Sequence, residues 1–247
     1  MTACFAGHDP TDCTDYPGPI CCATAGIQST DCTRRYTHMK LFDFERAPNP
    51  RRVRIFLAEK GIEIPIVHVN LYQLEQLTAE FRAINPGGTV PVLETDEGAY
   101  LTEAIAICSY LESLHPEPTL FGASDLHRAR VLMWDNICEN EGLSAVAEVL
   151  RNWSPGFRDR ALPGPVDHEQ IPALVERGRK RCGMFFDRIE RQLAHHANLA
   201  YERYSMADIT LLVTVDFARW VDIDATIGRP RLRQWYVEAS VRPSAKA

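Results

Sequence analysis

Glu103 stands at the start of an apolar helical pattern, EAIAICSYLESL, where a carboxylate can serve either the fold or a ligand. The helix dipole alone favours an acidic side chain in a first turn by about 0.3–1 kcal/mol. In the alternative interpretation, Thr102 caps the helix, Glu103 faces a bound ammonium, and free N–H groups of the same turn hold a carboxylate. One helix start would then grip both charges of an amino acid.

Pro91 lies at the mouth of an apolar strand pattern, TVPVLET. Proline cannot donate a ladder hydrogen bond, so a simple edge-strand position is one explanation for it. The other is a cis Val90–Pro91 bond, which would turn the N–H and C=O of Val90 outward to pair with an extended peptide. This motif alone leaves both explanations open.

Strand and helix patterns alternate through the first part of the chain. The strand patterns KLFDF and IPIVHVNL (Ile64–Leu71) flank a helical pattern that stops at Gly61. A second helical pattern covers Leu74–Asn85, and the strands VPVLET and AYLT then flank DEG as a hairpin. Together with the helix that Glu103 begins, the order is βαβαββα.

The second half of the chain has helical patterns and no convincing strand. Long helical patterns cover 125–153, 173–196 and 206–221, with a loop over 154–172. The fold class is therefore an α/β domain of thioredoxin-like order followed by an all-α helical bundle. The predicted boundaries are 39–117 for the α/β domain, 118–124 for a linker, and 125–247 for the all-α domain.

Residues 1–38 contain Cys4, Cys13, Cys21, Cys22 and Cys32 but no periodic pattern. A metal site is one interpretation, but no CxxC pair occurs and the spacing fits no common zinc motif. The segment also lacks the charged start and apolar block of a secretory signal. We interpret it as a disordered or non-native extension, with the orderly pattern beginning at Met39.

Composition narrows the classes of partner. The net charge of −6 provides no basic field for a polyanion, which argues against a nucleic-acid partner. No apolar run approaches the roughly 20 residues that a membrane-spanning helix needs. We therefore expect a cytoplasmic protein with no membrane partner.

Several motifs, taken in order, resemble the cytosolic glutathione transferases. They are the βαβαββα order, TVPVL, LTEAIAICSYLE, the all-α second half, and YSMADI. In YSMADI, Ser205 and Asp208 have the spacing of a helix capping box, with Asp at the third helical position in place of Glu or Gln. The resemblance runs from Met39 to about Pro243.

The resemblance implies where glutathione would lie. Pro91 is then the cis proline, and Val90 pairs its backbone with the cysteinyl part of glutathione. Glu103 and the N–H of Ala104 hold the γ-glutamyl end, although the family commonly has Ser at the position of Ala104. The family often has Lys near the position of Thr89, which this chain lacks.

Gln76 is the remaining residue that could contact the glycyl end, and an ordinary surface position on a helix is its alternative interpretation. In the second half, Trp134 is the tryptophan predicted to reach a second-substrate pocket. Packing in the core is the alternative for Trp134.

A catalytic group is harder to find, because glutathione transferases place Tyr, Ser or Cys before the first helix. None of these occurs between Lys40 and Lys60, and Ala47 and Pro50 stand where redox relatives carry the two thiols of C-P-x-C. Asn49 is the one short neutral donor there. Its amide could donate to a glutathione thiolate, aided by the helix N-terminus and a neighbouring arginine, or it could simply cap the helix.

The sequence thus predicts a glutathione transferase that adds the thiol of glutathione to small apolar electrophiles. Glutathione is a co-substrate, and neither a cofactor nor a metal is expected. The resemblance implies a homodimer, and we expect a role in detoxification. The alternatives are a non-catalytic glutathione-binding scaffold or ligand carrier, or another glutathione-dependent enzyme such as a peroxidase, dehalogenase or isomerase.

Overall fold

A computed structural model describes residues 38–247 of the chain. The extension predicted over residues 1–38 therefore lies almost wholly outside the described residues. The first part of the described chain contains a small sheet with three α-helices. Its elements are β1 (Lys40–Asp43), α1 (Pro48–Lys60), β2 (Ile66–His68), η1 (Glu75–Leu77), α2 (Ala79–Ile84), β3 (Val92–Glu94), β4 (Tyr100–Thr102) and α3 (Ala104–Leu114).

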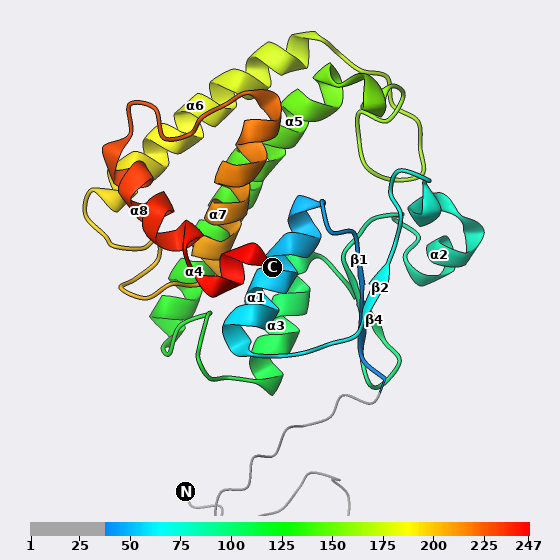
Figure 1. The fold of residues 1–247 in the computed structure, drawn as a ribbon, viewed down its shortest axis with the longest axis horizontal. Helices are drawn as coiled ribbons and strands as arrows, with labels where there is room; N and C mark the ends of the chain where they lie inside the picture. The colour runs from blue at the N-terminus through cyan, green and yellow to red at the C-terminus, as the bar shows by residue number, and fades with distance from the viewer. Residues whose placement is uncertain (1–37) are drawn as a thin grey trace, which may run out of the picture. The chain divides into compact units, whose positions relative to one another are not determined.

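The sheet has the strand order β2-β1-β3-β4. β1 is parallel to β2, whereas β3 is antiparallel to both β1 and β4. Helices α1 and α3 lie together on one face of the sheet, and α2 lies on the other (Figure 1). This arrangement confirms the βαβαββα prediction.

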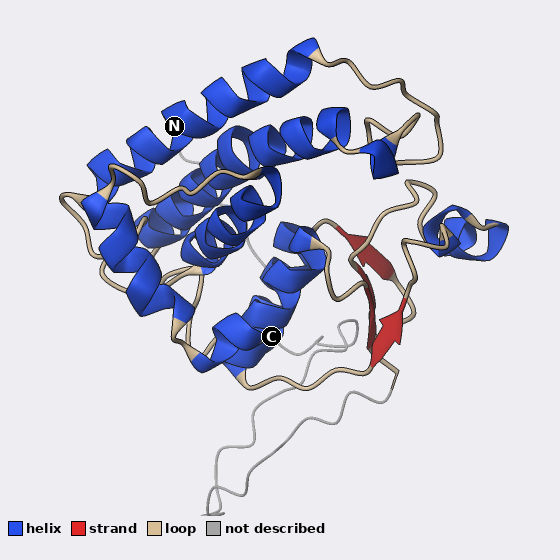
Figure 2. Ribbon diagram, turned by 45° about the horizontal axis from the view of Figure 1, so that its top comes forward, coloured by secondary structure: helices blue, strands red, loops and turns tan. Residues whose placement is uncertain are grey.

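The rest of the described chain is helical, as predicted (Figure 2). Its elements are α4 (Asp125–Ile137), η2 (Cys138–Leu143), α5 (Ser144–Trp153), η3 (Pro155–Phe157), α6 (Ala173–Leu193), α7 (Met206–Ala218), η4 (Arg219–Val221), α8 (Pro230–Ser240) and η5 (Pro243–Lys246). Helix α7 packs directly against α1, and η5 returns to the same helix. One hydrophobic core therefore runs from the sheet through both halves, including Val53, Ile107 and Leu211.

Two predicted elements are shorter than their patterns. The second strand is limited to Ile66–His68, and the helix predicted over Leu74–Asn85 is divided at Thr78. Thr78 has an extended backbone, and its side chain accepts a hydrogen bond from the N–H of Phe81. Threonine favours this capping geometry over a helix interior, so α2 begins only at Ala79.

The helix predicted over 125–153 contains a π-helical segment, η2, between α4 and α5. A π-helical turn accommodates one residue more than an α-helical turn, and such segments occur frequently at functional sites. No sequence pattern indicated it. Glu139, which contacts the candidate site described below, belongs to this segment.

The predicted capping box at the start of α7 is present. The carboxylate of Asp208 accepts from the N–H of Ser205 at 3.0 Å and from its hydroxyl at 2.7 Å. It also accepts from the N–H of Leu199 at 3.0 Å. Asp208 is completely buried, and this burial raises its pKa to about 6.

The raised pKa of Asp208 predicts a specific pH dependence of stability. The folded state keeps this proton up to a pH of about 6, whereas the unfolded state releases it near the usual aspartate value of about 3.9. Between these values the folded state binds more protons, so the free energy of unfolding falls as the pH rises. Urea denaturation across this range should show that Asp208→Asn removes this part of the slope. An unchanged slope in the variant would contradict the assignment.

Candidate active site

Three segments that are distant in sequence meet at one end of the sheet, where β1 and β4 finish and β3 begins. Phe42, near the end of β1, is paired with Val92 at the start of β3. Val92 is in turn paired with Thr102 at the end of β4. Because β3 is antiparallel to both neighbours, three segments meet at this end of the sheet: the β1–α1 loop, the segment before β3 and the start of α3. The fold thus brings together the neighbourhoods of Asn49, Val90 and Glu103.

The Val90–Pro91 peptide bond is cis, as the resemblance implied. The edge-strand explanation for Pro91 is wrong, because β3 is an inner strand of the sheet and Pro91 immediately precedes it. Val90 is half-buried and outside any strand, and its N–H and C=O hydrogen-bond to no other residue within 38–247. Its backbone is therefore free to pair with an extended ligand.

Glu103 is itself the N-cap residue of α3, and Thr102 ends β4, so the prediction that Thr102 caps the helix is wrong. The backbone of Glu103 has φ 65° and ψ 121°, and its side chain makes no capping bond. A non-glycine residue in such a conformation costs roughly 1–3 kcal/mol. The exposed carboxylate forms no ion pair within the described residues.

Ala104 begins α3 and is 3% exposed. The first backbone bond of this helix joins the N–H of Ile107 to the carbonyl of Glu103. The N–H groups of the turn before Ile107 therefore have no intrahelical acceptor and are available to an anion. They adjoin the free carboxylate of Glu103, which gives a donor set and an acceptor at one helix start.

Gln76 lies beside the segment that leads to Val90. A Cβ atom placed on Gly88 would be 3.1 Å from the carbonyl oxygen of Gln76, so the two backbones are in close contact. The side-chain Oε1 of Gln76 is buried and has no partner among the residues described. Gln76 is half-buried in the short helix η1, and its contact with the glycyl end stays a prediction.

The N-terminus of α1 is almost devoid of free donors. Ala47 is its N-cap residue, so the prediction that Asn49 caps the helix is wrong. Pro48 and Pro50 have no N–H, and the N–H of Arg51 already bonds to the carbonyl of Ala47 at 3.2 Å. The first turn consequently offers one backbone donor, the N–H of Asn49, next to the exposed side-chain amide of the same residue.

Neither neighbouring arginine points its charge freely into the site. Arg51 pairs with Asp216 at 2.7 Å and donates to the carbonyl of Ala245 at 2.9 Å. Arg52 is 1% exposed and donates from Nη1 to Oδ1 of Asn49 at 3.2 Å. Arg51 is thus occupied elsewhere, whereas Arg52 reaches the site through Asn49.

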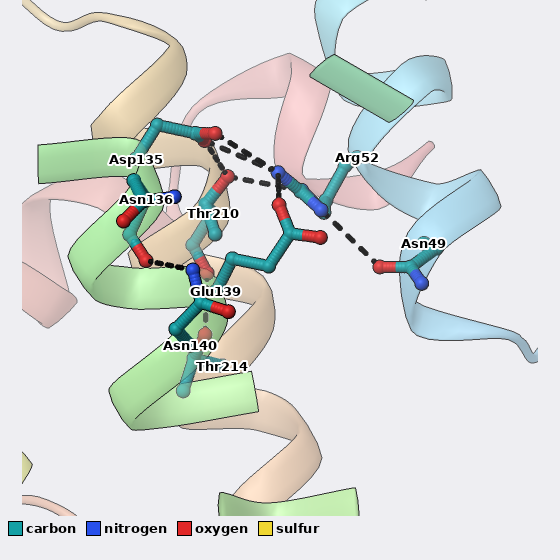
Figure 3. Close-up of polar contacts among 8 residues, drawn as sticks. All are labelled: Asn49, Arg52, Asp135, Asn136, Glu139, Asn140, Thr210 and Thr214. Carbon is teal, nitrogen blue, oxygen red and sulfur yellow. Dashed lines mark hydrogen bonds and ion pairs between the residues drawn. The ribbon is translucent and has the colours of Figure 1, made fainter. Parts of the chain in front are cut away.

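Arg52 is held by residues of α4, η2 and α7 (Figure 3). Its Nε donates to Thr210 of α7 at 3.0 Å, and its Nη2 lies 3.2 Å from Asp135 of α4 and 3.1 Å from Glu139 of η2. The hydroxyl of Thr210 donates to Asp135 at 2.5 Å. Burial raises the pKa of the Asp135 carboxyl, and the guanidinium of Arg52 opposes that shift.

Sequence reasoning missed Asp135, Glu139 and Thr210 as members of this cluster. A signal existed, because Asp135 and Thr210 interrupt apolar helical stretches at positions that a buried face would fill. Which arginine they pair with depends on tertiary packing of α1 against α4 and α7. Single-sequence patterns do not give that packing.

Comparison with known proteins shows which family this chain belongs to. Residues 47–114 match the model of the glutathione S-transferase N-terminal domain, and residues 172–238 match the model of the C-terminal domain. Glutathione S-transferase 2 of Saccharomyces cerevisiae is 34% identical over 84% of this chain and 88% of its own length. The chain belongs to the glutathione S-transferase family.

Other relatives agree with this assignment. A maleylacetoacetate isomerase of Pseudomonas aeruginosa is 42% identical over 184 residues, covering 60% of this chain and 85% of the isomerase. The crystal structure of Gtt2 from Saccharomyces cerevisiae has a TM-score of 0.77 at 33% identity, with 84% of this chain and 98% of that chain covered. A glutathione S-transferase domain-containing protein of Marinobacter aquaeolei gives a TM-score of 0.76 at 33% identity, over 83% and 98% of the chains.

Trp134 and Trp220 differ in how far they are exposed. Trp134 is 8% exposed and belongs to the core, with the guanidinium of Arg188 of α6 5.5 Å from its ring. Core packing accounts for Trp134, and its contact with a second substrate stays a prediction. Trp220 is 45% exposed and lies beneath Arg46, a residue of the loop between β1 and α1. Trp220 is therefore the exposed tryptophan beside the start of α1.

Three further features of the described residues concern metal binding, membrane spanning and the cysteines. In residues 38–247, no three or more His, Cys, Asp or Glu side chains are grouped so that they could hold a metal ion. Over the same residues, no helix combines the length and apolar character needed to cross a bilayer. The described cysteines, Cys108, Cys138 and Cys182, are all buried.

The strained backbone of Glu103 gives a test that separates binding from folding. We expect both Glu103→Gly and Glu103→Ala to lose most glutathione affinity, because each removes the carboxylate. Only the glycine variant relieves the positive φ, and it should raise the free energy of unfolding by about 1 kcal/mol. Calorimetric titration with glutathione and urea denaturation measure the two effects. Full glutathione affinity in either variant would contradict the role of this carboxylate.

Proposed function

We propose that this glutathione transferase binds glutathione at the end of the sheet where β3 begins, and adds its thiol to small apolar electrophiles. The observation that carries the proposal is that the neighbourhoods of Asn49, Val90 and Glu103 meet at this end of the sheet. The cysteinyl part of glutathione pairs with the free backbone of Val90. Its γ-glutamyl ammonium faces Glu103, and the carboxylate of the same group accepts from the free N–H groups at the start of α3.

Gln76 contacts the glycyl end in this arrangement. Its buried, unpartnered side-chain oxygen lies in a segment that packs on Gly88. As the amide assignment of a glutamine depends on its partners, the same side chain can present its NH₂ to the glycyl carboxylate. Ala104 offers a backbone N–H but lacks the hydroxyl that the family commonly has at this position.

The chemical step is an attack by the glutathione thiolate. The thiol releases its proton to water, and the electron pair left on sulfur forms the bond to the electrophilic carbon. In a substitution, the bond from that carbon to its leaving group breaks and the group departs as an anion. In an addition, the π bond at that carbon opens and its far carbon takes a proton from water. Asn49 stabilises the thiolate with its side-chain NH₂ and its backbone N–H, the free donors of the first turn of α1. Catalysis then depends on positioning and electrostatic stabilisation, without a covalent intermediate on the protein.

The electrophile lies against the exposed ring of Trp220. This ring contacts Phe217 edge-on, with centroids 5.4 Å apart, and it borders the β1–α1 loop through Arg46. An aromatic face at this position favours apolar or planar electrophiles. The electrophile site would thus be formed by Phe217 at the end of α7 and Trp220 of η4, beside the loop that leads to α1.

We also propose that the protein is a homodimer in the cytoplasm. Leu126 and Met133 are 60% and 49% exposed and lie two helical turns apart on α4. Tyr100 on the outer strand β4 is 43% exposed. These apolar side chains would be covered by a second copy of the chain.

A second candidate reaction is a glutathione-dependent isomerisation, which the 42% identity to the maleylacetoacetate isomerase favours. There the thiolate adds to an activated double bond, the resulting single bond rotates, and the same carbon–sulfur bond breaks. The same thiolate site serves both reactions. A substrate panel that contains a chloro-nitro-aromatic compound and a maleyl diketo acid distinguishes them.

Replacement of Asn49 tests the thiolate donor. Asn49→Ala should raise the pKa of the bound glutathione thiol by about one unit and lower kcat/KM several-fold, because a hydrogen bond to the charged form is lost. Glutathione affinity should stay close to that of the wild type, since Val90 and Glu103 are unchanged. The thiolate absorbance of the bound tripeptide as a function of pH measures the shift. A wild-type profile would leave Asn49 with no role in catalysis.

Replacement of Trp220 tests the electrophile site. Trp220→Ala should raise the KM for an aromatic electrophile about ten-fold, which corresponds to the loss of roughly 1.4 kcal/mol of contact, while the KM for glutathione is unchanged. Trp153→Ala is a matched control, because Trp153 is 50% exposed but lies at the end of α5. Equal effects of the two variants would contradict the proposed pocket.

A further inference from the structure

Asn49 presents an amide with two chemically opposite ends. Its Oδ1 is an acceptor that would repel a thiolate, and its Nδ2 is a donor that would stabilise one. An exposed asparagine near a helix end can rotate its amide by half a turn and exchange the two ends. The usefulness of Asn49 as a thiolate donor therefore depends on what fixes this rotation.

Arg52 can act toward Asn49 only as a hydrogen-bond donor. A guanidinium has donors and no acceptor, so its Nη1 can bind Oδ1 of Asn49 but not Nδ2. The bond is 3.2 Å long, and Nδ2 points away from Arg52 (Figure 3). Nδ2 donates no hydrogen bond to another residue within 38–247. The arginine thus selects the orientation in which the donor end of the amide faces outward.

The guanidinium itself has little freedom to move. Its side chain is 1% exposed, and every nitrogen of its fork has a partner from α1, α4, η2 or α7. Asp135 and Thr210 are buried beside it and bond to each other, so the partners of the guanidinium are also fixed. The planar fork of arginine can satisfy these separate directions at once, which a lysine ammonium on a flexible stem cannot do.

We propose that Arg52 is a positioning residue for thiol activation, which locks the amide of Asn49 with its NH₂ facing the sulfur of glutathione. This rests on the proposed function, because it assumes that Asn49 is the thiolate donor. Thr210 supports the lock from α7 by holding Nε of Arg52 and one oxygen of Asp135. The reactivity of glutathione in the first domain is then set partly by helices of the second domain.

The test compares the pKa of the bound glutathione thiol in variants with and without Asn49. Arg52→Lys keeps the charge but loses the fork, and it should raise the thiol pKa by about one unit in the Asn49 background. In the Asn49→Ala background the same change should cause no further shift, because there is no amide to orient. Glutathione affinity and circular dichroism are measured alongside to establish that each variant is folded.

Thr210→Val is the second variant, because it leaves the guanidinium in place and removes only the hydroxyl that holds it. It should give a smaller shift in the same direction, again absent in the Asn49→Ala background. Thr214→Val is its matched control, since within the described part of the chain the hydroxyl of Thr214 bonds only to the carbonyl of Thr210, at 2.7 Å. Arg51→Lys is the control for arginine, because Arg51 pairs with Asp216. Neither control should shift the thiol pKa.

The outcomes separate the positioning role from the proposed function. Equal shifts from Arg52→Lys in both backgrounds would mean that Arg52 acts without Asn49, and the positioning role would be overturned. A folded Thr210→Val variant with a wild-type thiol pKa would also overturn it. If Asn49→Ala alone leaves the thiol pKa unchanged, the thiolate-donor role in the proposed function fails first.

Discussion

The buried guanidinium of Arg52 is the interaction on which the site and the domain junction both depend. It lies in α1 and is satisfied by Thr210 of α7, by Asp135 of α4 and by Glu139 of η2. Removing one member of such a buried cluster leaves an uncompensated charge, which typically costs about 3–5 kcal/mol. The packing of α1 against α4 and α7 is therefore specified by charge as well as by the continuous hydrophobic core.

Charges also hold α1 at its other contacts with the second half. Arg51 pairs with Asp216, whose other oxygen accepts from the hydroxyl of Tyr236 at 2.6 Å. Glu59 near the end of α1 binds Arg242 through two hydrogen bonds of 2.7 Å. The helix that carries Asn49, the proposed thiolate donor, is thus anchored along its length, which favours a preorganised site.

The sequence predicted the architecture well, because apolar periodicity, turn residues and the Ser205–Asp208 spacing are local signals. It also indicated Pro91 and Glu103, whose types are unusual for their positions, and through Pro91 it indicated the preceding residue, Val90. It failed where the outcome depends on tertiary contacts. The capping role given to Thr102 was wrong because the strand continues to that residue and Glu103 itself takes a positive φ. The partners of Arg52 and the exposure of Trp220 follow from helix packing, which no local pattern contains.

The most direct measurement of the central claim is a crystal structure of the protein with glutathione bound. The account predicts the sulfur within hydrogen-bonding distance of Nδ2 of Asn49, with the cysteinyl backbone paired to Val90 and the γ-glutamyl ammonium at Glu103. The account would be contradicted if the sulfur faced another side chain, or if the site at Val90 and Glu103 stayed vacant at saturating glutathione.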